Sequence, residues 1–196
     1  LNLAEFALMG NILAKHALNI ARPKVALLNI GAEEMKGKEE IHEAAKLIKR
    51  AKLDIDFIGY IEPHEIPEGK ADVIVTDGFT GNIALKSIEG TAKLVVRLIK
   101  DGIKKSFIAK LGLPFMLGVG MNIKKTMDPR LYNGAMLVGL NGLTVKSHGG
   151  TDALGYSVAV GNAVSLVRQN FVPTIKDELE TVDLDALSEE ILYDSY

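Results

Sequence analysis

Apolar and polar positions follow two rhythms along this chain, one typical of helices and one typical of short buried strands. Apolar side chains that return every three or four residues predict helices over residues 3–18, from about 38, from 83 to about 100 and from 153 to about 168. Short apolar runs bounded by turn-forming residues predict strands at residues 25–29, 56–61, 71–76 and 143–147. Strands and helices therefore alternate along the chain.

This alternation predicts the fold class. Strands that alternate with helices of ten or more residues form a mainly parallel sheet with helices on both faces, a three-layer α/β/α arrangement. With 196 residues, the chain is long enough for one main domain. We therefore expect an α/β domain over residues 1–170, with a helical hairpin inserted at 101–130 and an acidic tail at 171–196.

Three of the predicted strands lead through a glycine-containing loop into a helix. These loops lie at residues 29–31, 77–82 and 148–152. In an open parallel sheet, ligands bind beyond the carboxyl ends of the strands. Glycine lets the backbone approach a ligand there, and the first N–H groups of a helix attract anions. We expect the three loops to form one anion-binding edge; the alternative is that they are ordinary turns.

Individual residues of these segments are candidate contacts for a phosphate. Thr80 or Asn82 is expected to cap one helix, and Thr151 or Asp152 another. The candidate contacts are small, polar or cationic residues in or just after the loops: Asn29, Gly31, Asp77, Gly78, Gly81, Asn82, Lys86, Gly149 and Asp152.

Lys146 and His148 are the candidate catalytic residues. They lie two positions apart at the end of a predicted strand, and a period of two places them on the same face. Such a pair could neutralise an oxyanion or a phosphate, or move a proton. The alternative is that both side chains only pair with nearby carbonyl groups.

Several other chemistries lack their motifs. The chain has no cysteine, which excludes disulfides and thiol nucleophiles. No P-loop motif and no GxGxxG after a strand points to a nucleotide, and no HExxH motif points to a metal. No GxSxG motif points to a serine nucleophile. We therefore expect no cofactor and no metal.

Charge is distributed unevenly, although the net charge is only −2. Residues 91–130 contain nine Lys or Arg and two Asp, a net of +7. Residues 171–196 contain one Lys and eight acidic residues, a net of −7. Such a separation predicts a basic face that attracts an acidic partner or an anionic membrane, and the alternative is a solvated helix face.

The basic segment encloses thirteen uncharged residues, 111–123, which include Leu113 and Phe115. This stretch is too short to cross a membrane, and Gly112 and Pro114 are expected to break a helix. It is expected either to enter a membrane interface or to be buried in a hairpin or dimer contact. The lysines that flank it share the first of these predicted roles: Lys104, Lys105, Lys110, Lys124 and Lys125.

The motifs at residues 25–31, 68–86, 139–142 and 146–152 together resemble PlsX, the bacterial phosphate acyltransferase family of phospholipid synthesis. The similarity covers nearly all of residues 3–170, in the family's order. Through the third motif, the resemblance adds Asn141 to the candidate phosphate contacts. PlsX proteins are longer at the amino end, so residues that help to form their site lie outside this chain.

The resemblance implies transfer of a fatty acyl group from acyl carrier protein to inorganic phosphate. A membrane glycerol-phosphate acyltransferase would then use the acyl phosphate. It also implies a homodimer, and a cytoplasmic protein that associates peripherally with the membrane and has no nucleic-acid partner. Two alternatives stay open: a phosphotransacetylase-like enzyme that uses short-chain acyl-CoA, and a non-catalytic module that binds a membrane or a partner.

Overall fold

The fold is built around a three-stranded parallel sheet. The computed structural model describes residues 2–33, 35–51 and 54–180, apart from the side chain of Lys124. The central strand β1 (Lys24–Leu28) lies between β2 (Asp56–Ile61) and β3 (Val73–Val75), and both neighbours run parallel to it. The carboxyl ends of the three strands therefore meet at one edge of the sheet. Residues 181–196, most of the predicted acidic tail, lie outside the described residues.

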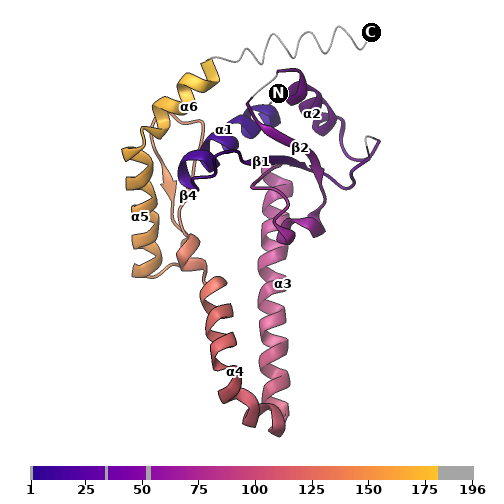
Figure 1. Ribbon diagram of the computed structural model, residues 1–196, viewed down its shortest axis with the longest axis vertical. Coiled ribbons are helices and arrows are strands. Elements are labelled where there is room, and N and C mark those ends of the chain that lie inside the picture. The colour runs from indigo at the N-terminus through magenta and orange to yellow at the C-terminus, as the bar shows by residue number, and fades with distance from the viewer. Residues whose placement is uncertain (1, 34, 52–53, 181–196) are drawn as a thin grey trace.

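Helices cover both faces of this sheet (Figure 1). Because successive strand residues point to opposite faces, β1 buries Val25 and Leu27 on one side and Ala26 and Leu28 on the other. The first pair packs with α1 (Asn2–Ala17) and α2 (Glu39–Arg50). The second pair packs against the 3₁₀-helix η1 (Pro63–Glu68) and the beginning of α3 (Gly78–Lys105). The predicted α/β fold class is confirmed.

The chain after residue 126 forms a second unit that packs on α1. It comprises η2 (Pro129–Tyr132), β4 (Ala135–Met136), β5 (Val145–Lys146), α5 (Ala153–Arg168) and α6 (Phe171–Glu180). Its apolar core joins Phe171 and Leu166 to Leu8 and Ile12 of α1. α1 thus connects the two units through its buried faces.

The prediction that residues 143–147 add a fourth strand to the parallel sheet is wrong. β5 pairs with β4 in a separate antiparallel sheet, where Ala135 lies opposite Lys146. The intervening loop turns at Gly139, whose φ is 82°. A strand pattern indicates extended structure but not the partner strand, and a partner nine to eleven residues away closes a short loop at low entropic cost.

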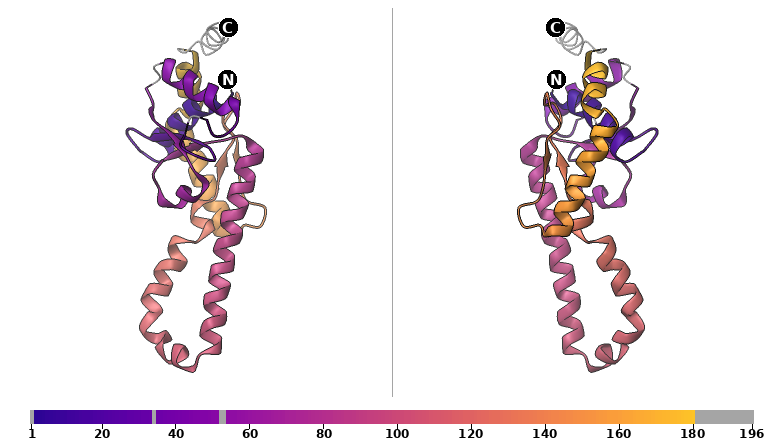
Figure 2. Two further views of the ribbon diagram at one scale, coloured as in Figure 1. Left: turned by 90° about the vertical axis from the view of Figure 1, so that its right-hand side faces the viewer. Right: turned by 90° about the vertical axis from the view of Figure 1, so that its left-hand side faces the viewer.

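α3 and α4 (Phe107–Thr126) form a long helical hairpin that projects away from the sheet (Figure 2). The hairpin is longer than the predicted insertion at 101–130, because α3 begins at Gly78 and runs unbroken to Lys105. Ser106 forms the turn, and its Oγ accepts the Ala109 N–H at 3.2 Å. Pro114 does not break α4, which is continuous over 20 residues but bent in its first half; a bend is the usual effect of proline within a helix.

Candidate functional site

The loops after β1 and β3 lie side by side, as their neighbouring strands require. β1 and β3 pair in parallel, with Leu27 opposite Val75, so the loops that follow them leave the same edge of the sheet. The pKa of Asp77, at the start of the second loop, is lowered chiefly by hydrogen bonds from Thr80, with a smaller contribution from the charge of Lys38, at the end of the first loop. The Asn29 N–H donates to the Ile61 carbonyl at 2.9 Å, which also joins the end of β2 to this edge. The sequence therefore predicted correctly that two of its three loops meet.

Asn29 supports the first loop from within. Its side chain is only 3% exposed, and its Nδ2 donates to the Lys36 carbonyl at 2.7 Å. Among the described residues its Oδ1 is buried without a hydrogen-bond partner, and it lies where a Cβ on Gly37 would be placed, 1.9 Å from that position. Gly37 has a φ of 101°, so the loop needs glycine there for both reasons. Gly31 is buried beneath Glu33 and Lys36, which pair at 2.9 Å.

Asp77 is the N-cap of α3, a role that the sequence had assigned to Thr80 or Asn82. Its carboxylate accepts the Thr80 N–H at 2.8 Å and the Thr80 hydroxyl at 2.6 Å. These hydrogen bonds lower the pKa of Asp77, the hydroxyl contact most strongly. Gly78, Gly81 and Asn82 consequently lie in the first turns of the helix rather than in a loop. The helix terminus thus already binds a carboxylate, close to where phosphate was expected.

Lys86 lies on α3 about two turns beyond its start, with an exposed side chain. It opens a row of cations on one side of this helix, at spacings of seven, four, three and four residues: Lys86, Lys93, Arg97, Lys100 and Lys104. Such spacings return to the same helix face. All five side chains are exposed, and the row runs for about 27 Å from the loop end towards the hairpin turn.

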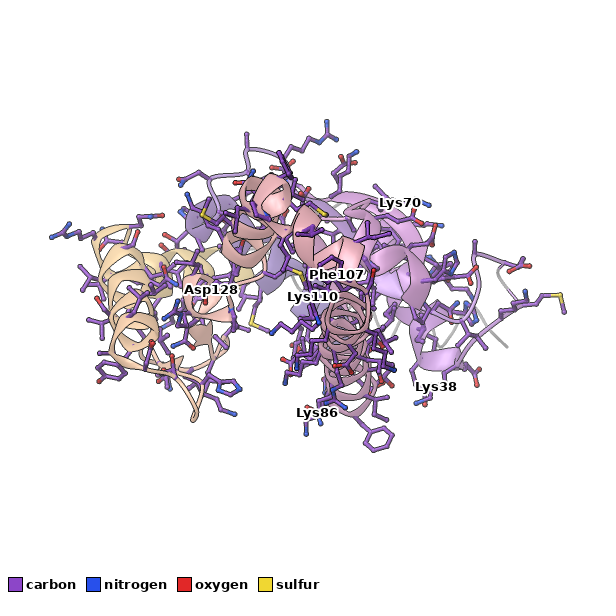
Figure 3. All side chains as sticks on the ribbon, turned by 90° about the horizontal axis from the view of Figure 1, so that it is seen from below. Lys38, Lys70, Lys86, Phe107, Lys110 and Asp128 are labelled. Atoms are coloured by element: carbon purple, nitrogen blue, oxygen red, sulfur yellow. The ribbon has the colours of Figure 1, made fainter. Side chains whose placement is uncertain are left out.

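The third loop, residues 148–152, lies in the second unit. Its hydrogen bonds run to residues 130–133 and to the first turn of α5. Figure 3 shows Asp128, at the base of this unit, and Lys38, beside Asp77, on opposite sides of α3. The expected single edge of three loops is therefore not formed, because β5 belongs to a different sheet from β1 and β3.

Asp152 caps α5, as predicted. Its carboxylate accepts the Gly155 N–H at 3.1 Å and binds Nη1 of Arg130 at 2.9 Å, and these two contacts hold its pKa below the ordinary value, the Gly155 bond most strongly. Arg130 also binds Asp128 through Nε and Nη2, at 2.9 and 2.6 Å. Both carboxylates raise the pKa of Arg130 above its ordinary range. This ion-paired group fixes the start of α5 to η2.

His148 and Lys146 are both exposed, and the residues that alternate with them, Val145 and Ser147, are half-buried. The pattern agrees with the prediction that the Lys146 and His148 side chains share a face. The His148 N–H donates to Oδ1 of Asn133 at 2.9 Å, and its ring Nδ1 accepts the Gly150 N–H at 3.1 Å. Gly149 is exposed in the same turn, and Asn141 is exposed in the β4–β5 loop.

Two residues that organise this region were not predicted from the sequence, Arg130 and Asn133. Asn133 is 6% exposed, and its side chain contacts Ser147, two residues of the loop and one residue of α5. The local sequence signal is the pair Asn133-Gly134, a common turn dipeptide. Within the described part of the chain, no group of three or more His, Asp and Glu is placed to hold a metal ion.

Known proteins match the chain over most of its length. The family described as fatty acid synthesis protein matches residues 1–174. The phosphate acyltransferase of Paramagnetospirillum magneticum is 48% identical over 179 residues, 91% of this chain and 51% of that protein. The phosphate acyltransferase of Rhodospirillum rubrum is 46% identical over 183 residues, 93% of this chain and 52% of that protein. The chain belongs to the PlsX family.

The chain spans about half the length of these PlsX relatives. The region that matches the family includes every candidate site residue, from Asn29 to Asp152. The two loop groups are therefore both parts of a PlsX sequence, although their hydrogen bonds run to different partners: Asp77 binds Thr80, whereas residues 148–152 bind residues 130–133 and α5.

Proposed function

We propose that the full-length protein transfers a fatty acyl group from acyl carrier protein to inorganic phosphate, which yields an acyl phosphate for phospholipid synthesis. The observation that supports this most directly is 46–48% identity to proteins named phosphate acyltransferase over more than nine-tenths of the chain. By "full-length protein" we mean this chain together with any residues encoded before or after it.

The proposed reaction requires no covalent intermediate with the protein. An oxygen of hydrogen phosphate attacks the thioester carbonyl carbon, the C–S bond breaks, and the proton of the phosphate passes to the leaving thiolate. A thioester is already activated, so the protein mainly orients the two reactants and stabilises the negative charge on the carbonyl oxygen. This chemistry needs no cysteine and no serine nucleophile, and the chain has neither a cysteine nor a GxSxG motif.

In this proposal both loop groups contribute to the site. The edge after β1 and β3, with Lys86 nearby, would hold phosphate through backbone N–H groups and a cation. Lys146 and His148, with the turn around Gly149, would contact the reacting oxygens. Since the relatives are about twice as long as the chain, we propose that their remaining residues complete the walls between the two groups.

The hairpin supplies the proposed contacts with larger partners. The cationic row on α3 would bind the acidic surface of acyl carrier protein. The exposed apolar residues near the turn would enter a membrane interface; Phe107 is 74% exposed and Phe115 91%. No helix in the described part of the chain is long and apolar enough to cross a membrane. A homodimer is also part of the proposal.

Chain-length preference tests the function directly. The purified full-length protein should form acyl phosphate from long-chain acyl carrier protein and phosphate, detected as hydroxamate after trapping with hydroxylamine. Acetyl phosphate from acetyl-CoA, without any product from the long-chain substrate, would instead identify a phosphotransacetylase-like enzyme.

The second alternative, a binding module without catalysis, makes a different prediction. Lys146→Ala and His148→Ala should each lower the rate of acyl phosphate formation by about 100-fold if these residues touch the reacting oxygens. Unchanged rates in both variants would show that the chemistry lies elsewhere.

A further inference from the structure

The ring of His148 has a defined tautomer in this fold. Its Nδ1 accepts the backbone N–H of Gly150 at 3.1 Å. A neutral imidazole has one nitrogen that bears hydrogen and one that accepts. Because Nδ1 is the acceptor, the hydrogen of the neutral ring is on Nε2, and the exposed side of the ring presents a donor.

The backbone of His148 is also held on both sides of the residue. Its N–H donates to Oδ1 of Asn133 at 2.9 Å, and its carbonyl accepts the Thr151 N–H at 3.1 Å. The second bond closes the turn that brings the Gly150 N–H to the ring. The position of the peptide before His148 therefore depends on one side chain, that of Asn133.

Asn133 is itself fixed by its surroundings. It is 6% exposed, and its Nδ2 donates to the Gly155 carbonyl at 2.8 Å and to the Ser147 hydroxyl at 2.9 Å. The backbone carbonyl of Asn133 accepts a hydrogen bond from Nδ2 of Asn162 at 3.0 Å. A buried amide whose polar atoms are all paired has one orientation, and rotating it would leave several partners unsatisfied.

We infer that Asn133 is a positioning residue that sets His148 as a neutral donor, through Nε2–H, to an oxygen of the phosphate or of the thioester. The inference rests on the proposed function, since it assigns a role within the acyl transfer. It also decides between the two roles that the sequence left open for His148, because it assigns charge stabilisation rather than removal of a proton.

His148 is assigned as a donor because a ring that acts as a base through Nε2 needs its hydrogen on the other nitrogen. For Nε2 to take a proton from phosphate, the neutral ring must have its hydrogen on Nδ1. That hydrogen would face the Gly150 N–H, and the bond between them would be lost. A donor at Nε2 costs no such bond, and the proposed reaction already delivers the proton of hydrogen phosphate to the thiolate. A preorganised donor aimed at developing charge is an effective catalytic group.

Nitrogen NMR of the full-length protein, labelled with ¹⁵N-histidine, tests the positioning without reference to activity. At a pH where the ring is neutral, His148 should carry its hydrogen on Nε2. Asn133→Ala should give a mixture of tautomers, and Asn162→Ala, which removes a bond to the same segment without touching His148, should not. Hydrogen on Nδ1 in the wild type, or an unchanged tautomer in Asn133→Ala, would overturn the inference.

If Asn133→Ala does not fold, Ser147→Ala takes its place, because it removes one acceptor of the Asn133 amide and leaves the remaining contacts. The expected change is a smaller shift in the same direction. An unchanged tautomer in that variant would count against the role of Asn133.

The catalytic half of the inference is tested by replacing the ring. His148→Gln keeps an N–H donor near the position of Nε2 but cannot act as a base. Its kcat should stay within about tenfold of the wild type, whereas His148→Ala should lose about 100-fold or more. Equal losses in both variants would indicate a base. If the wild type forms no acyl phosphate at all, the proposed function fails, while the NMR measurement still decides the role of Asn133.

Discussion

At the scale of single residues, the two helix caps show how local chemistry limits an anion site. Asp77 and Asp152 each bind the first N–H groups of a helix, where the sequence had placed a phosphate. A carboxylate at that position satisfies the same donors and the same dipole. In the proposed reaction, phosphate would then bind beside the caps, to cations and to backbone groups of the turns. Lys86 and the turn at His148 are the residues suited to that task.

Gly134 offers a test of how tightly the turn before β4 is packed. Its φ is 108°, and a Cβ there would lie 3.0 Å from the Cα of Ala159 in α5. Gly134→Ala should therefore lower the free energy of unfolding of the full-length protein by about 1–3 kcal/mol, measured by urea denaturation.

The matched control for this substitution is Gly142→Ala. A Cβ on Gly142 would meet open space, so its effect should stay within about 0.5 kcal/mol. Equal stability of the Gly134 and Gly142 variants would show that the turn does not need glycine at position 134.

At the scale of elements, the hairpin differs from an ordinary pair of helices in a globular core. No residue of α3 is buried, and apolar side chains are exposed along both α3 and α4. The apolar residues that the sequence predicts to contact a membrane lie in α4, where Leu113 is 40% exposed and Phe115 is 91% exposed. The first turn of α4, next to Ser106, contains Phe107 and Ile108, which were not predicted and are 74% and 82% exposed.

Membrane contact by this hairpin is tested with vesicles. Phe107→Glu with Phe115→Glu should lower the fraction of full-length protein that sediments with vesicles of anionic lipid by about tenfold or more, because each change places a charge in the apolar interface. Leu85→Glu, an exposed residue at the other end of α3, is the control and should bind like the wild type. Undiminished sedimentation of the double variant would argue for a protein contact instead.

At the scale of the whole molecule, the structure shows where the basic residues of the charged segment lie. The cations of α3 form one row that begins near the edge after β3 and ends near the hairpin turn. An acidic partner bound along this row would be close both to the candidate phosphate loop and to the proposed membrane contact. Electrostatic attraction of this kind acts on association and weakens as salt screens it.

Reversing part of the row tests the proposed dock for acyl carrier protein. Lys93→Glu with Lys100→Glu should raise KM for acyl carrier protein by about tenfold, leave kcat nearly unchanged and make KM less sensitive to salt. Lys46→Glu with Lys49→Glu makes the same charge change at exposed positions on α2 and serves as the control. Equal effects of the two double variants would mean that net charge, not the row, attracts the partner.

The sequence by itself determined most of the strands and helices of the first 100 residues, the α/β class and the family. Hydrophobic spacing reports which side chains must be buried together, and this is sufficient to recognise strands such as 25–29 and helices such as 153–168. The motif at 68–86 is long enough to indicate PlsX, which the family match and the relatives confirmed. The meeting of the loops after β1 and β3 also followed from the pattern, since neighbouring parallel strands end at one edge.

Only the tertiary structure decided which strands pair and which polar groups hydrogen-bond to one another. The pattern at 143–147 is equally compatible with a parallel sheet and with the local hairpin that forms, because periodicity contains no information about the partner strand. The length of the hairpin was underestimated, since the cap at Asp77 begins α3 before its apolar spacing becomes evident. Asn133 escaped notice because its partners lie 14 to 29 residues away and converge only through folding. One of these long-range hydrogen bonds joins Oδ1 of Asn133 to the backbone N–H of His148.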